Sequence, residues 1–365
     1  MDLIYLIIDK AISLDATDIH LAPGLVPVYR ISRKLFFDET KLPLDEVILN
    51  QFLDYFYEKN KGLKEKFELK KQADFSYSYK ETRFRINVSI TKGIPTFSIR
   101  IIPNGEIKAD SLGLKDIIRK VQRVHSGLVL ITGKVNSGKS TTMNAFLQEV
   151  NRTENKKIVT LEDPIEYEHT SQKSIVIQKE IGEQSDVINF NAGLVNLLRE
   201  DADITVLGEI RDRKTMDVAI DLAESGGLVI GTLHTRSCGE TIERIINMYD
   251  PGEQMAIKNS ISSVLKIVVS QKLLVSTKNT LILVPEIMVV NNTIEAQIRQ
   301  EKFSVSDIED SIHTQKENGC VSYESSFADM YAKGLLDMAT VVENVDPNRL
   351  SIIKNLIVSY GGEVT

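Results

Sequence analysis

The chain has 365 residues, a hydrophobic content of 42% and a charged content of 26%, which predict a globular protein of two or three domains. Its net charge of −7 argues against a protein that coats nucleic acid, and its two cysteines exclude a disulfide framework and a four-cysteine zinc site. The sequence has no apolar run of the roughly 20 residues that a membrane span requires, so we expect a cytoplasmic protein without direct membrane insertion.

The first hundred residues predict a small α+β module. Apolar residues recur at helical spacing in 1–14. Three later segments alternate apolar and polar residues, as half-buried antiparallel strands do: 74–80, 82–90 and 95–102. This alternation places Arg83, Arg85 and Arg100 on the polar faces of two neighbouring strands. The three arginines form either a solvated sheet face or a patch that contacts an anion.

After a Pro- and Gly-containing linker at 102–113, the sequence "ITGKVNSGKSTT" at 131–142 fits the pattern G-x-x-x-x-G-K-[ST]. The motif follows a predicted strand and precedes a predicted helix that begins near Lys139. Backbone N–H groups and the positive end of that helix can surround a phosphate, Lys139 would bridge two phosphates, and Ser140 would bind Mg²⁺. The residues predicted to contact the nucleotide here are Gly133, Asn136, Ser137, Gly138, Lys139, Ser140 and Thr141.

Four short apolar runs predict buried strands of a parallel sheet: 128–132, 157–161, 204–208 and 228–233. Two of them end in acidic residues, Glu162 with Asp163 and then Glu209. Carboxylates at the carboxyl edge of a parallel sheet lie where ligands bind, and there they orient water or hold Mg²⁺. Asp163 precedes a proline and is equally a turn residue. His234 ends the fourth run, where it could sense a terminal phosphate.

Beyond residue 251 the pattern predicts helices, the first of them over 253–274, and one strand at 280–290. We expect the weakly patterned tail from about 346 to fray. The remaining histidines and both cysteines are interpreted as structural; they are His20, His125, His169, His313, Cys238 and Cys320.

The ordered motifs "GKVNSGKST", "LEDPIEY", "GEIRD" and "GTLHT" resemble Walker A, the Asp box, Walker B and the His box of the secretion-superfamily ATPases of type IV pili and type II secretion. "TDIHLAPGLVPVYRI" and "RFRIN" resemble the PAS-like domain that precedes the ATPase domain in that family. The resemblance implies four regions: a PAS-like domain at 1–103, a linker at 104–115, a RecA-like P-loop ATPase domain at 116–292 and a helical region at 293–365.

The chain lacks the extra N-terminal region and the four-cysteine insertion of the extension ATPases, so it resembles the short PilT/PilU branch of pilus retraction ATPases. This resemblance implies a homohexamer that uses ATP and Mg²⁺ and acts on an inner-membrane platform protein, with a paralogous pilus ATPase as a further partner. It also implies a cytoplasmic protein that is peripheral to the inner membrane through protein partners, with no nucleic acid partner. The stretch "TIEAQIRQE" at 293–301 departs from the branch's retraction-linked motif.

The resemblance also implies roles for the site residues. Glu162 positions or activates water, Glu209 supports the Mg²⁺ shell and His234 reports the state of the γ-phosphate, although the roles of the two glutamates are exchangeable. The three arginines would reach the phosphates. Asn136 stands where the branch usually has glycine, and we expect a left-handed backbone there because asparagine tolerates one.

Three other functions stay open on sequence alone. The first is a pilus-extension or secretion assembly ATPase with a shortened N-terminus. The second, from another class, is a RecA-like nucleic-acid translocase, against which the acidic composition counts. The third is a regulatory module that holds a nucleotide without hydrolysing it.

Overall fold

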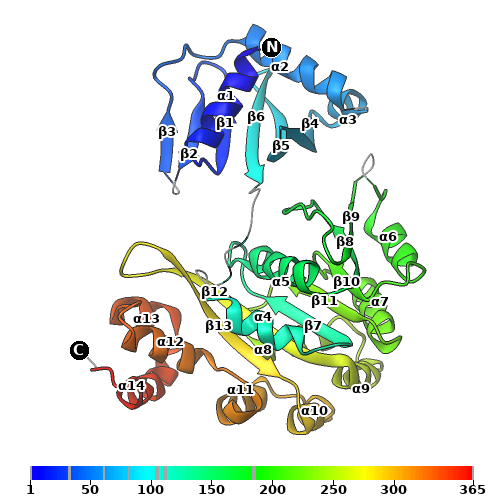
Figure 1. Cartoon of the computed structure of the whole chain (residues 1–365), viewed down its shortest axis with the longest axis vertical. Coiled ribbons are helices and arrows are strands. Elements are labelled where there is room, and N and C mark those ends of the chain that lie inside the picture. Colours follow the sequence, from blue (N-terminus) through cyan, green and yellow to red (C-terminus); the bar gives the residue numbers. More distant parts are fainter. Residues whose placement is uncertain are drawn as a thin grey trace. The chain divides into compact units, whose positions relative to one another are not determined.

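The computed structural model describes residues 2–31, 34–60, 62–80, 82–102, 107, 109, 113–182 and 186–363. The chain divides into two compact units, which Figure 1 shows in blue to cyan and in cyan to red. The first unit is Met1–Gly105 with the short segments Pro164–Glu168 and Gly182–Asp186, and the second is the remainder. Much of the predicted linker at 104–115 lies outside the described residues. In the described part of the chain, no helix is long and apolar enough to cross a membrane.

The first unit is built on an antiparallel sheet with the strand order β3-β2-β1-β6-β5-β4. Its strands are β1 (Asp18–Leu21), β2 (Val28–Ile31), β3 (Lys34–Phe37), β4 (Gln72–Tyr79), β5 (Thr82–Thr91) and β6 (Ile94–Ile102). Phe84 of β5 and Phe97 of β6 are buried, and along both strands buried residues alternate with more exposed ones. This alternation confirms the predicted period of two. This inward face shares one core with the helices α1 (Asp2–Ser13), α2 (Glu46–Lys59) and α3 (Leu63–Lys70).

The second unit contains a seven-stranded sheet in the order β13-β12-β7-β11-β10-β8-β9, parallel except for β13. The strands are β7 (Gly127–Thr132), β8 (Lys157–Glu162), β9 (Ile175–Glu180), β10 (Ile204–Leu207), β11 (Leu228–Leu233), β12 (Leu265–Val275) and β13 (Leu281–Val289). This α/β arrangement confirms the predicted fold class, and the four apolar runs are its central strands.

One predicted helix is wrong. The helix over 253–274 ends early: α9 spans Gln254–Val264, and the chain then continues as strand β12. The β-branched residues Ile267, Val268 and Val269 are buried between β7 and β13, because an apolar stretch buried on both faces fits a central strand as well as a helix.

Helices cover both faces of this sheet, as Figure 1 shows. One core joins α4 (Lys115–Gln122) and α5 (Lys139–Thr153) to residues such as Val129 and Ile131 of β7. The opposite core joins Leu128 and Leu130 of the same strand to the helices α6 (Phe190–Leu197), α7 (Arg213–Glu224), α8 (Cys238–Ile246), α9, α10 (Asn292–Ile298) and α11 (Val305–Thr314). Alternate residues of β7 therefore serve the two cores.

The chain ends in a small helical cluster on β13. Helices α12 (Tyr323–Ala332), α13 (Met338–Asn344) and α14 (Leu350–Ser359) pack around Val284. Ile353 and Ile357 of α14 are fully buried, so the expectation that the tail frays from about 346 is wrong. A short helix with two buried isoleucines one turn apart is anchored by packing rather than by its own propensity.

Candidate active site

The glycine-containing loop between β7 and α5 has the backbone geometry that a phosphate cradle needs. The φ angles of Gly133, Asn136 and Gly138 are +149°, +62° and +86°. The left-handed backbone predicted at Asn136 is therefore confirmed. Gly133 admits no side chain, because a Cβ there would lie 2.3 Å from Oγ of Ser137 and 2.5 Å from the carbonyl oxygen of Gln271.

Lys139 lies at the start of α5 with its amine over this loop. Its Nζ donates to the carbonyl oxygens of Gly133 at 3.0 Å and Lys134 at 3.1 Å, and it lies 3.1 Å from Nδ1 of His234. Since an ammonium group can only donate, Nδ1 of His234 accepts and its ring proton belongs on Nε2. Lys139 is buried, and it places its amine at the N-terminus of α5, where anions bind.

Glu209 follows strand β10 and completes a row with these two residues. Its Oε1 lies 3.3 Å from Nε2 of His234, and its Oε2 pairs with Arg211 at 2.8 Å. Burial by itself would raise the pKa of Glu209. Arg211, His234 and Lys139 together outweigh burial and lower this pKa below its ordinary value. Glu209 is therefore an ionised carboxylate beside the loop lysine, as a cation ligand must be.

Glu162 ends the neighbouring strand β8 and has a different environment. It is only 2% exposed, and its Oε1 accepts hydrogen bonds from Oγ1 of Thr160 at 2.7 Å and from Nε2 of Gln178 at 3.2 Å. Asp163 is partly exposed and lies 4.0 Å from Arg211. Arg211 thus lies near acids from both strand tips.

Several residues at this site were missed by the sequence interpretation. Gln271 of β12 is buried; its Nε2 donates to the carbonyl oxygen of Ser137 at 2.8 Å and its Oε1 accepts from Thr142 at 3.0 Å. It therefore supports the phosphate loop through a hydrogen bond from the neighbouring strand. Arg211 was visible inside "GEIRD", whereas Gln271 carries no motif signal and lies in the stretch predicted as helix.

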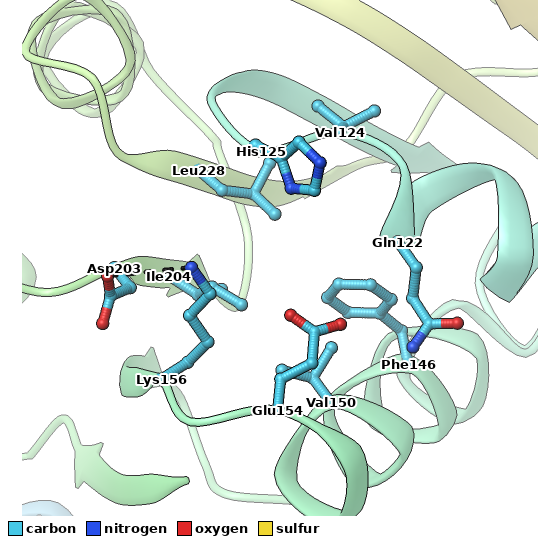
Figure 2. A pocket seen from close by; sticks show the side chains of 10 residues that line it. All are labelled: Gln122, Val124, His125, Phe146, Val150, Glu154, Lys156, Asp203, Ile204 and Leu228. Carbon is cyan, nitrogen blue, oxygen red and sulfur yellow. Dashed lines mark ion pairs between the residues drawn. The ribbon is translucent and has the colours of Figure 1, made fainter.

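A cavity of about 250 Å³ borders the loop and is lined by Gly133, Lys134, Val135, Asn136, Ser137, Arg236, Gln271, Lys272, Leu273, Leu274, Glu343 and Asn344. A second hollow, shown in Figure 2, has a volume of only about 10 Å³. It lies by Ile204 and Leu228, the first residues of β10 and β11, and so at the edge of the sheet opposite to the loop. That volume is about one water molecule and excludes a nucleotide.

The three predicted arginines lie on the sheet of the first unit. Arg85 is exposed and stands opposite Arg100 in the β5–β6 register, and Arg100 pairs with Asp18 at 3.1 Å. Arg83 shares the polar face with Arg85 and pairs with Glu168 at 2.7 Å. Their common polar face is confirmed, and their contact with a nucleotide stays a prediction.

The residues of the second unit fit a nucleotide carrying Mg²⁺. The loop offers a helix N-terminus and a buried lysine, and Oγ of Ser137 is buried with no hydrogen-bond partner among the described groups. The described residues contain no separate cluster of three or more His, Cys, Asp and Glu side chains that could hold a metal. Ser140 and Glu209 are the groups that would complete the coordination of a phosphate-bound Mg²⁺.

Comparison with known proteins identifies relatives with this architecture. The family described as "Type II/IV secretion system protein" matches residues 72–346. The type IV pilus retraction ATPase PilT of Pseudomonas aeruginosa is 34% identical over 88% of this chain and 92% of its own length. The type IV pilus ATPase PilU of the same species is 27% identical over 90% of this chain and 85% of its own length. A crystal structure of the pilus retraction motor PilT with bound ADP superposes with a TM-score of 0.84 at 34% identity, covering 95% of this chain and 98% of that one.

Proposed function

This chain belongs to the type II/IV secretion system protein family, within which it is a PilT-type pilus retraction ATPase. We propose that it works as a homohexamer and that it hydrolyses ATP to retract a type IV pilus. The observation that carries the proposal is the row formed by Lys139, His234 and Glu209 beside the phosphate loop. A lysine amine, a histidine ring and a carboxylate next to a helix N-terminus are groups that can bind a terminal phosphate and support its cleavage.

The side chains divide the work of hydrolysis as follows. The amine of Lys139 moves from the loop carbonyls to the β- and γ-phosphates, and backbone N–H groups from Asn136 to Thr141 bind the phosphate oxygens. Glu162 orients the attacking water and accepts its proton as the bond from oxygen to the γ-phosphorus forms and the bond to ADP breaks. Mg²⁺, when bound, neutralises charge on the phosphate oxygens; Ser140 and Glu209 would hold it.

His234 connects the phosphate end of the site to the Glu209 carboxylate. With Nδ1 accepting from Lys139 and Nε2 facing Glu209, the ring changes partners when the lysine turns to a phosphate. We infer that this exchange reports whether the γ-phosphate is present. The polar sheet face that carries Arg83, Arg85 and Arg100 would supply further positive charge to the phosphates, as the family resemblance implies.

The proposed partners are those that the family resemblance implies. They are further copies of this chain in a homohexamer, an inner-membrane platform protein and a paralogous pilus ATPase, and they would place the protein at the cytoplasmic face of the inner membrane. The presence of both PilT and PilU in Pseudomonas aeruginosa supports the last of these partners. The net charge of −7 agrees with partners that are proteins rather than nucleic acid.

The test is a strain that carries Lys139→Ala in the full-length protein. We expect loss of twitching with surface pili retained or in excess, because extension continues without retraction. Lys134→Ala is the matched control, since the Lys134 side chain is exposed and the hydrogen bond to Lys139 is made by the Lys134 carbonyl oxygen, which the substitution keeps. Bald cells would instead favour an extension or secretion motor. ATP hydrolysis stimulated by single-stranded DNA would favour a translocase.

A further inference from the structure

A continuous line of hydrogen bonds runs beneath the active site, from the first turn of α5 to the tip of β8. Nδ2 of Asn144 donates to the carbonyl oxygen of Ser140 at 2.8 Å, and Nε2 of His169 lies 2.7 Å from Oδ1 of Asn144. The backbone N–H of His169 donates to Oε1 of Gln178 at 2.8 Å, and Nε2 of Gln178 donates to Glu162. The line therefore joins the proposed Mg²⁺ ligand to the proposed base.

The directions of these bonds determine the state of His169. Because the amide nitrogen of Asn144 is used by Ser140, its oxygen must accept, so Nε2 of His169 must carry a proton. Burial lowers the pKa of His169 to about 4. The ring is therefore neutral at physiological pH and exists as the tautomer protonated on Nε2.

Gln178 is oriented in the same way. Its oxygen accepts from the His169 backbone, so its amide nitrogen necessarily faces Glu162. Thr160 stands directly opposite Gln178 in the β8–β9 register and donates to the same carboxylate oxygen. Two donors from neighbouring strands thus fix Oε1 of Glu162, and Asn144, which anchors the line in α5, is fully buried.

We propose that His169 is a positioning residue for ATP hydrolysis: its side chain fastens the 169–178 segment to α5, and that segment holds Glu162 at a set place relative to Ser140. The inference rests on the proposed role of Glu162 as the base. Positioning of this kind matters because misplacing a reacting group by about 1 Å can cost about a hundredfold in rate. The described hydrogen bonds of His169 go to Asn144 and Gln178 rather than to the loop, so we expect substitution of this residue to affect the rate more than the nucleotide affinity.

The test uses three variants of the full-length protein. His169→Phe keeps a flat ring but removes the donor to Asn144, and His169→Gln keeps a donor near the position of Nε2. Gln178→Met removes the direct donor to Glu162 while keeping a similar length. His125→Phe is the matched control, because His125 is exposed at the opposite edge of the sheet (Figure 2). The measurements are kcat and KM for ATP, the Kd of a fluorescent ATP analogue, and Tm.

We expect kcat to fall by on the order of tenfold or more in His169→Phe and Gln178→Met, with the Kd within about twofold of wild type. His169→Gln should recover most of kcat, and His125→Phe should match wild type. A kcat within twofold of wild type in both His169→Phe and Gln178→Met would overturn the inference. So would a loss of kcat, nucleotide affinity and Tm together that His169→Gln does not rescue.

A parallel Glu162→Gln variant separates this inference from the proposed function. If Glu162→Gln is inactive while His169→Phe and Gln178→Met are normal, the positioning role is wrong and the base assignment stands. If Glu162→Gln itself turns over ATP normally, the base assignment is wrong, and the positioning role falls with it.

Discussion

The two acidic strand tips of the active site are held in opposite ways. Glu162 is buried and accepts hydrogen bonds from the neutral groups of Thr160 and Gln178. Glu209 is partly exposed and pairs with the guanidinium of Arg211. Two neutral donors fix the position of Oε1 of Glu162, whereas the cation partner of Glu209 keeps that carboxylate ionised and can be replaced by another cation. The difference favours Glu162 as the base and Glu209 as the metal ligand.

The strongest way to break this comparison is to neutralise each acid in turn. Glu162→Gln and Glu209→Gln should each lower kcat by on the order of a hundredfold or more, while ATP still binds. Only Glu209→Gln should raise the Mg²⁺ concentration needed for half-maximal activity, because only that variant loses a proposed metal ligand. Steady-state ATPase assays over a Mg²⁺ titration measure both effects. A raised Mg²⁺ requirement in Glu162→Gln alone would exchange the two roles, and near-normal turnover in both would refute the assignment.

How far the sequence predicts these features depends on how local their causes are. The loop, the acid-tipped strands and the polar arginine face follow from short patterns, and all are present. Strand β12 was predicted as helix because a continuous apolar stretch has no decisive period, and its pairing with β7 and β13 decides its conformation.

Side-chain partners distant in sequence are harder still to predict. His169 and Asn144 are 25 residues apart, and Gln271 and Ser137 are 134 apart. Gln271 meets Ser137 because β12 pairs with β7, and His169 meets Asn144 where the segment after β8 lies against α5. No motif spacing records such contacts, so a histidine interpreted as structural from the sequence proves to be part of the hydrogen-bond line that reaches Glu162.

Substitution of Gln271, which supports the phosphate loop, tests whether nucleotide affinity can be lowered without disturbing either acid. Gln271→Met leaves the Ser137 carbonyl without its donor, at a cost of about 1–1.5 kcal/mol, and should raise KM for ATP about tenfold. The kcat and the Mg²⁺ requirement should stay near wild type, because Gln271 forms hydrogen bonds to the loop and to Thr142. Gln122→Met, at the hollow of Figure 2, is the control. A fall in kcat without a change in KM would show that Gln271 acts on one of the acids instead.

Removing the cation partner of Glu209 should give a smaller, pH-dependent effect. Burial raises the pKa of Glu209 and Arg211 lowers it, so Arg211→Ala should let this pKa rise. Activity should then be lost at a higher pH on the acid side than in wild type, with a change of only a few-fold near pH 8, because the arginine is largely exposed.

Arg213→Ala is the matched control for this change, since Arg213 pairs with Glu253 rather than with an active-site acid. ATPase activity measured from pH 5 to 9 should show the same acid limb for the control and the wild type. An unchanged acid limb in Arg211→Ala would mean that Arg211 does not set the charge of Glu209.

The smallest effect is expected at Asn136 in the phosphate loop. Asn136 has a φ of +62° and an exposed side chain, so Asn136→Gly keeps the backbone available and should change KM and kcat by no more than about threefold. Asn136→Ala should cost more, because alanine has a Cβ in the left-handed region, where it costs about 1–2 kcal/mol, and lacks the short polar side chain by which asparagine tolerates that conformation. Since this residue adjoins neither acid, any loss should appear in KM for ATP. If Asn136→Ala lowered kcat and left KM unchanged, the loop conformation at Asn136 would affect the chemistry at Glu162 or Glu209. The two acids would then not be held independently of the loop.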